Sequence, residues 1–97
     1  MSDGPEHARS LLEALSALED WEALEEFLPR ARNQVPGLAL LGRCCERAEG
    51  QLARARGDHA GAVAAFERAL AGFEALNAAA EAAATRETLS AVRATST

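Results

Sequence analysis

Side chains that commonly carry out catalysis are few in this chain and are not grouped. The two histidines are His7, near the start, and His59, which follows a Gly-Asp pair. A catalytic nucleophile requires a base within hydrogen-bonding reach and a third group that orients that base. Neither histidine lies in such a pattern, and we expect the adjacent Glu25 and Glu26 on a solvated helix face. The sequence therefore predicts a protein that is not an enzyme.

Ligands for a metal or a cofactor are equally sparse. Cys44 and Cys45 are adjacent, and no histidine stands at the spacing of a zinc site. Neighbouring residues on a helix point to different faces and do not readily form a disulfide with each other, so we expect small, reduced, buried side chains. Gly57 and Gly61 lack the surrounding residues of a phosphate-binding loop. We predict no metal and no cofactor.

A third kind of chemistry is open to the arginines. Arg47, Gln51 and Arg54 recur at spacings of four and three, which places them on one face of a helix. Guanidinium groups bind carboxylates through paired, charge-assisted hydrogen bonds. This face could bind an acidic partner, or it could be a solvated face whose arginines pair with nearby glutamates. The sequence leaves both readings open.

The composition describes a small acidic protein. The chain has 97 residues, of which 48% are apolar, and a net charge of −5. This length suits one domain, and the acidic charge argues against direct binding of nucleic acid. No apolar stretch approaches the roughly 18 residues needed to cross a bilayer, so we expect no membrane partner. The opening "MSDGPEHARS" is unlike a secretory signal. All 10 basic residues are arginine, and with the expected free thiols this indicates a bacterial, cytoplasmic protein.

Apolar residues recur with the helical period and strand-like alternation is absent, so the predicted fold class is all-α. We expect helices over about residues 5–18, 20–35, 38–56, 59–76 and 79–94. Pro29 should bend the second helix or split it. Gly57 suits the end of one helix, and Asp58 suits the N-cap of the next. The residues predicted to face the core are Ala8, Leu11, Leu12, Leu15, Leu18, Trp21, Leu24, Leu28, Ala31, Val35, Leu41, Cys44, Cys45, Ala48, Leu52, Ala55, Ala62, Val63, Phe66, Ala69, Leu70, Phe73, Ala82, Ala83, Leu89 and Val92.

The chain contains an internal repeat. Residues 19–31 align with residues 57–69 at an offset of 38, which pairs Asp20 with Asp58 and Leu28 with Phe66. Each copy reads as one helical hairpin. We therefore predict a single domain over residues 1–97, built from a hairpin at 5–37, a hairpin at 38–77 and a C-terminal helix at 78–95.

The second copy resembles the tetratricopeptide repeat. Its matching residues are Gly50, the turn at 57–58, Ala62 with Phe66 four positions later, and Ala69. The resemblance implies a short α-solenoid of about five helices, in which the first helix of each hairpin lines a concave groove that binds a peptide or a helix. His59 stands where the family has an aromatic ring, so we expect His59 to be packed.

The resemblance also indicates which residues would face that groove. In the second hairpin these are Arg47, Gln51 and Arg54, and in the first hairpin the alignment gives Arg9, Glu13 and Ser16. The family has a subclass that clamps a carboxylate with Lys and Asn at corresponding places, and Arg47 with Gln51 is chemically similar. The predicted peptide-binding residues are therefore Arg9, Glu13, Arg47, Gln51 and Arg54, and the expected partner is a protein or peptide with acidic groups.

Two alternatives remain open. The stretch "FERALAGFEALNAAAEAAATRETL" resembles the helical-repeat regions of bacterial regulators of the MalT and LuxR types. The chain could then be an oligomerisation domain or a fragment of such a regulator, with a homodimer contact through the segment Ala78–Ala84, which carries few charges. Some of these repeat regions bind sugars, but the lack of aromatic residues on the expected inner face argues against sugar stacking.

Overall fold

A computed structural model describes residues 5–33 and 39–95 of the chain, and side chains are described from Ala8 onward. Within these ranges the chain is helical and has no strand. The helices are α1 (Pro5–Ala17), α2 (Trp21–Arg32), α3 (Ala39–Ala55), α4 (His59–Ala75) and α5 (Ala79–Ala94). The predicted all-α class, with five helices, is confirmed.

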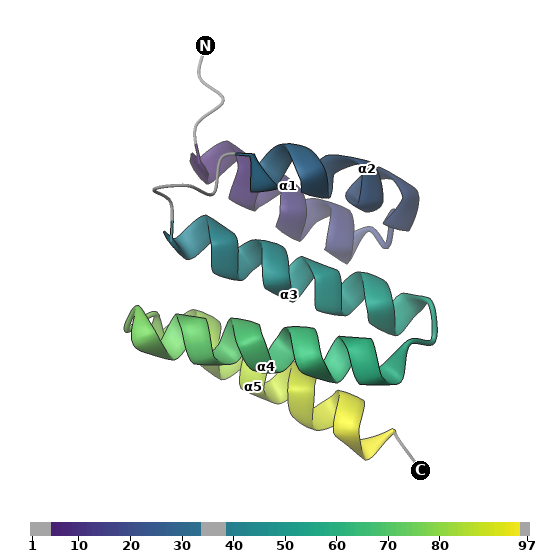
Figure 1. The fold of residues 1–97 in the computed structure, drawn as a ribbon, viewed down its shortest axis with the longest axis vertical. Helices are drawn as coiled ribbons and strands as arrows, with labels where there is room; N and C mark the ends of the chain where they lie inside the picture. The colour runs from purple at the N-terminus through teal and green to yellow at the C-terminus, as the bar shows by residue number, and fades with distance from the viewer. Residues whose placement is uncertain (1–4, 34–38, 96–97) are drawn as a thin grey trace.

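The helices run back and forth in chain order, with α3 in the middle (Figure 1). On one side α3 packs on both α1 and α2, and on the other side it packs on α4. The last helix, α5, packs chiefly on α4. This order makes the molecule longer in one direction than in the others, with extents of 47 × 31 × 19 Å.

Three helix connections share one corner geometry. In each corner, a residue with positive φ ends one helix and the next residue caps the following helix; the pairs are Glu19–Asp20, Gly57–Asp58 and Asn77–Ala78. The backbone N–H of each capping residue donates to a carbonyl five residues earlier at 2.9–3.0 Å, which is the pattern of a Schellman motif. The first two corners are 38 residues apart, so the structure repeats where the sequence repeats.

Aspartate side chains complete two of these corners. Asp20 accepts a hydrogen bond from the backbone N–H of Ala23 at 3.3 Å, and Asp58 accepts one from Gly61 at 3.0 Å. Each bond satisfies a backbone donor that has no partner within its helix. The predicted roles of Gly57 and Asp58 at the helix boundary are thereby confirmed. The third corner has Ala78 at the N-cap, and no side chain caps α5.

Apolar packing holds the helices together in two clusters. The larger cluster joins α1, α2 and α3 to Ala69 and Phe73 of α4 and to Ala82 of α5. The smaller cluster joins Ala62 and Phe66 of α4 to Leu89 and Val92 of α5. Most buried side chains are small, so the helices approach closely and a few large rings fill the remaining space.

Several sequence-based expectations differ from the structure. Helix α2 continues through Pro29, so of the two expected outcomes, a bend or a split, the split is wrong. Pro29 is exposed, its carbonyl still accepts from Asn33 at 3.1 Å, and buried Leu28 and Ala31 hold the helix on both sides. His59 is exposed rather than packed, since it stands at the first position of α4 on the solvent side of the corner.

The apolar residues predicted to face the core but found exposed are Leu18, Ala55 and Ala83. Leu18 is 75% exposed because α1 ends one residue before it. Ala55 is the last residue of α3, and Ala83 lies outside the single stripe that α5 buries against α4. The expected core position of Val35 and the helix end at 35–37 lie outside the described residues.

Candidate functional site

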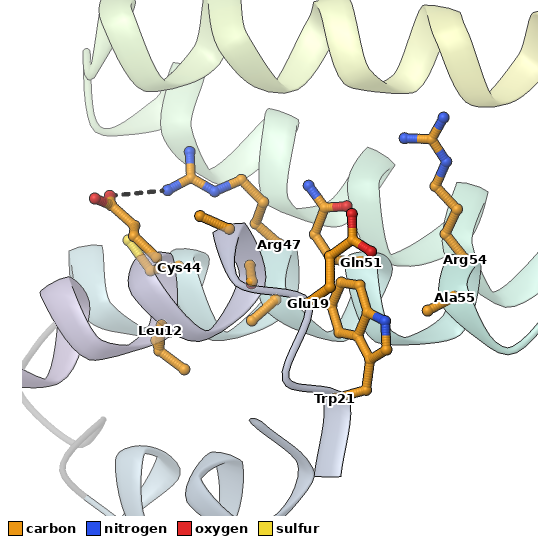
Figure 2. A pocket seen from close by; sticks show the side chains of 12 residues that line it. Leu12, Glu19, Trp21, Cys44, Arg47, Gln51, Arg54 and Ala55 are labelled. Atoms are coloured by element: carbon orange, nitrogen blue, oxygen red, sulfur yellow. Dashed lines mark hydrogen bonds and ion pairs between the residues drawn. The ribbon is translucent and has the colours of Figure 1, made fainter. Parts of the chain in front are cut away.

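A groove of about 760 Å³ lies between α1 and α3 and is closed at one end by the corner that leads into α2 (Figure 2). Its floor is apolar and comes from buried Leu12, Cys44 and Ala48. The half-buried indole of Trp21, the only tryptophan in the chain, stands at the closed end. The complete lining is Leu12, Glu13, Ser16, Ala17, Glu19, Trp21, Cys44, Arg47, Ala48, Gln51, Arg54 and Ala55.

Four of the five predicted binding residues line this groove. Glu13 lies on α1, and Arg47, Gln51 and Arg54 follow one another along α3. The helical phase read from the sequence therefore placed them on a shared surface. Arg9 is not part of the lining, although it lies one turn before Glu13 on α1. That these residues bind a peptide stays a prediction.

Two of the predicted binding arginines, Arg9 and Arg47, converge on one carboxylate, and that carboxylate belongs to α5. Arg47 Nη1 lies 2.5 Å from Glu81 Oε1, and Arg9 Nη2 lies 2.7 Å from Glu81 Oε2. Glu13 adds a second carboxylate, 3.4 Å from Arg47 and 3.6 Å from Arg9. We call these four residues the Glu81 network. The sequence left two alternatives for these arginines, binding of an acidic partner or pairing with glutamates of the chain. In the structure Arg9 and Arg47 bind a carboxylate that the chain itself supplies.

The Glu81 network is partly shielded from water. The side chains of Arg47 and Glu81 are only 15% and 19% exposed. The Arg47 guanidinium also lies over the ring of Phe73, 5.1 Å from its centroid, where the ring face attracts a cation. Three contacts from three different helices therefore fix Arg47 in place.

Burial and charge act in opposite directions on this network. Burial alone would raise the pKa of Glu81, but the hydrogen bond from Arg47 and the charges of Arg47 and Arg9 outweigh it and hold the pKa below its ordinary value. Burial likewise acts to lower the pKa of Arg9, but the neighbouring groups, chiefly the Glu81 and Glu13 carboxylates, together outweigh it, so this pKa is raised. Glu81 is thus ionised at neutral pH.

Glu81 was not among the predicted site residues. It is the only charged residue between Ala78 and Ala84, and that isolation is the one signal in the sequence that could have drawn attention to it. Because Glu81 is 34 residues from Arg47 and 72 from Arg9, no local pattern connects them.

The other end of the groove has a different character. Figure 2 shows the side chains of Glu19 and Gln51 beside each other above Trp21, while Arg54 extends away from the indole. Arg54 is exposed, and among the described residues neither Arg54 nor Glu19 forms an ion pair. This end therefore offers a cation, an amide and a carboxylate that form no ion pair or side-chain hydrogen bond within residues 8–33 and 39–95.

The cysteines are buried free thiols, as expected. Burial raises the pKa of Cys44 to about 11 and also raises the pKa of Cys45. Such thiols are unreactive near neutral pH because the thiolate is the reactive form. Across residues 5–33 and 39–95 there is no group of three or more His, Cys, Asp or Glu residues arranged to hold a metal.

None of the five described helices has the length and apolar character required to span a membrane. No family model, curated protein or solved structure matches the chain.

Proposed function

We propose that this protein is a non-enzymatic binding module that holds a segment of another protein in the groove between α1 and α3. The observation that carries the proposal is the groove itself, which has an apolar floor, polar walls and a volume of about 760 Å³. Binding sites of this kind commonly have volumes of roughly 300–1,000 Å³ and combine an apolar lining with a few polar groups.

The proposed architecture is a short tetratricopeptide-like solenoid. Three features support it: the corner geometry that recurs after 38 residues, the close contact of Gly50 with the Phe66 ring, and a groove lined by α1 and α3, the first helix of each hairpin. In such repeats the first helices of successive hairpins line the binding surface. The arginine-only basic composition and the reduced thiols support a bacterial, cytoplasmic setting.

The groove indicates the chemistry of the bound segment. An apolar side chain would cover Leu12, Cys44 and Ala48, since these form the floor. An acidic residue of the segment would lie beside Arg54, which has no ion-pair partner among the described residues. Backbone groups of the segment would bond to Gln51 and Ser16, which stand on opposite walls.

Trp21 allows a direct test. Peptides are selected from a displayed random dodecapeptide library on the whole chain, and their binding is measured by the emission of Trp21, which is the chain's only tryptophan. We expect the selected peptides to change this emission and to carry an acidic residue. Arg54→Glu should weaken their binding at least tenfold, because it replaces attraction by repulsion.

Arg30→Glu is the matched control. Arg30 is an exposed arginine of α2 outside the groove, so the same charge change there should leave binding intact. If selected peptides bind without changing the emission of Trp21, or bind both variants equally well, the groove is not the binding site.

A second candidate function is self-assembly through α5. This helix buries only the stripe of Ala82, Thr85, Leu89 and Val92. Its other faces expose alanines on which a partner helix could approach closely; these are Ala79, Ala80, Ala83, Ala84, Ala91 and Ala94. Sedimentation velocity at micromolar concentration tests this: a dimer that Ala83→Glu dissociates would support assembly, and a sharp monomer would exclude it.

A further inference from the structure

Glu81 occupies an unusual position for a side chain of the last helix. Helix α5 packs chiefly on α4, yet the Glu81 carboxylate is bound by an arginine of α1 and an arginine of α3. Each guanidinium binds a different oxygen, at 2.7 Å from Arg9 and 2.5 Å from Arg47. This arrangement is one that two arginines form around the carboxylate of a separate ligand.

Arg47 connects this arrangement to the groove. It lines the groove together with Glu13, while its guanidinium binds Glu81. Figure 2 shows Arg47 at the opposite end of the groove from Trp21, so Glu81, which binds Arg47 from α5, lies next to that end.

We propose that Glu81 is an internal ligand of a two-arginine carboxylate site, and that a carboxylate of a bound peptide competes with Glu81 for Arg9 and Arg47. The inference rests on the proposed function of the groove and adds its regulation. Release of Glu81 opens the site, and docking of Glu81 closes it against acidic ligands.

The site keeps its shape when Glu81 leaves. Arg47 retains its contact with the Phe73 ring and its ion pair with Glu13, and Arg9 retains Glu13 as well. The backbone of α5 stays on α4 through Leu89 and Val92, so only the Glu81 side chain has to swing outward.

An incoming carboxylate can reach the arginines from solvent. The side chain of Arg9 is 39% exposed, so an incoming carboxylate can reach it while Glu81 is still bound to Arg47. Water and salt screen the Arg9–Glu81 pair more than the shielded Arg47–Glu81 pair, so the Arg9 contact is the one that exchanges more easily. A ligand that must displace Glu81 binds with an affinity reduced by the fraction of molecules in which the arginines are free.

The test uses Glu81→Gln in the whole chain with two probes. One probe is an acetylated alanine–leucine peptide with a free C-terminal carboxylate, and the other is the same peptide as its C-terminal amide. Binding is followed by the NMR shifts of the arginine side-chain N–H groups and by Trp21 emission. We expect Glu81→Gln to bind the free-acid peptide about tenfold more tightly than the wild type, with no gain for the amide.

Glu87→Gln is the matched control. Glu87 is an exposed glutamate of the same helix, and its replacement by glutamine removes the same charge. It should leave the affinity for the free-acid peptide unchanged. Equal tightening in both variants, or equal tightening for acid and amide, would overturn the proposal.

A second variant distinguishes a change in binding from a loss of folding. Glu81→Asp keeps the charge on a shorter side chain, and we expect a smaller gain in affinity than for Glu81→Gln. If both variants are unfolded by circular dichroism, Glu81 is a structural residue and the proposal fails.

Failure of this inference is distinguishable from failure of the proposed function. Peptides that change Trp21 emission equally in the wild type and in Glu81→Gln contradict the competition and leave the groove function standing. Succinate that shifts the Arg47 signal only in Glu81→Gln, while no peptide changes Trp21 emission, supports the competition and contradicts the peptide groove.

Discussion

The ring of Phe66 lies directly against Gly50, where α4 crosses α3. A Cβ atom added at Gly50 would lie 2.8 Å from Cε1 of Phe66, which is closer than such atoms approach in proteins. Phe66 is fully buried, so its ring has little room to move. The absence of a side chain at residue 50 is therefore what lets the two helices of this hairpin pack as closely as they do.

Gly50→Ala should destabilise the protein by about 1–2 kcal/mol. Overpacking a core typically costs about 1–3 kcal/mol, and the better helix propensity of alanine returns less than about 1 kcal/mol. Urea denaturation measures the change. The double variant with Phe66→Leu should lose less than the sum of the two single variants, and strict additivity would show that the ring and Gly50 are not coupled.

Ala78→Ser should stabilise the protein by about 0.5–1 kcal/mol. The corner at Asn77–Ala78 has the geometry of the other two but lacks their side-chain cap, and a serine there can accept from the first turn of α5. A domain of this size should melt about 2–8 °C higher. Asp58→Ala is the reverse experiment and should cost about 1 kcal/mol; a gain there would contradict the capping argument.

The Glu81 network should make the free energy of unfolding depend on pH. The pKa of Glu81 is lowered in the folded state, so its contribution is present above its unfolded pKa of about 4.3 and is lost as the pH falls through the folded value. The stability advantage of the wild type over Glu81→Gln should therefore shrink between about pH 5 and pH 3. Urea unfolding of both proteins at each pH measures it. An advantage that stays constant over this range would show that the Glu81 charge does not contribute.

Both cysteines should resist alkylation in the native protein. With the pKa of Cys44 raised to about 11, its thiolate fraction at pH 8 is about two orders of magnitude below that of an unfolded thiol with a pKa near 8.5. Iodoacetamide labelling followed by mass spectrometry should be slow in buffer and fast in urea. Fast labelling in native buffer would show that the helices open around α3.

Expectations that depend on residues close together in the sequence were met more often than those that depend on packing between helices. Gly57 and Asp58 were placed correctly because a left-handed residue and a side-chain cap act within one turn of the chain. The span of α5 at 79–94 was also predicted correctly. The split expected as one outcome at Pro29 does not occur, because the buried neighbours Leu28 and Ala31 hold α2 on either side.

Burial at the ends of helices and on α5 was predicted less well. Helical phase alone predicted that Ala83 faces the core. It is exposed, because α5 has one main neighbour, α4, and buries only a narrow stripe. Leu18 and Ala55 stand at the ends of α1 and α3, where the phase still points inward but no other helix covers them.

The sequence by itself determined the helices, their corners, the repeat and the face shared by Arg47, Gln51 and Arg54, since all of these depend on residues within a few turns of one another. Only the tertiary structure decided how the charges on that face are used. The stacking of α5 on α4 brings Glu81 to Arg9 and Arg47 across 72 and 34 residues. Ion pairing depends on the distance between charged groups in space, and over such separations that distance is set by helix packing.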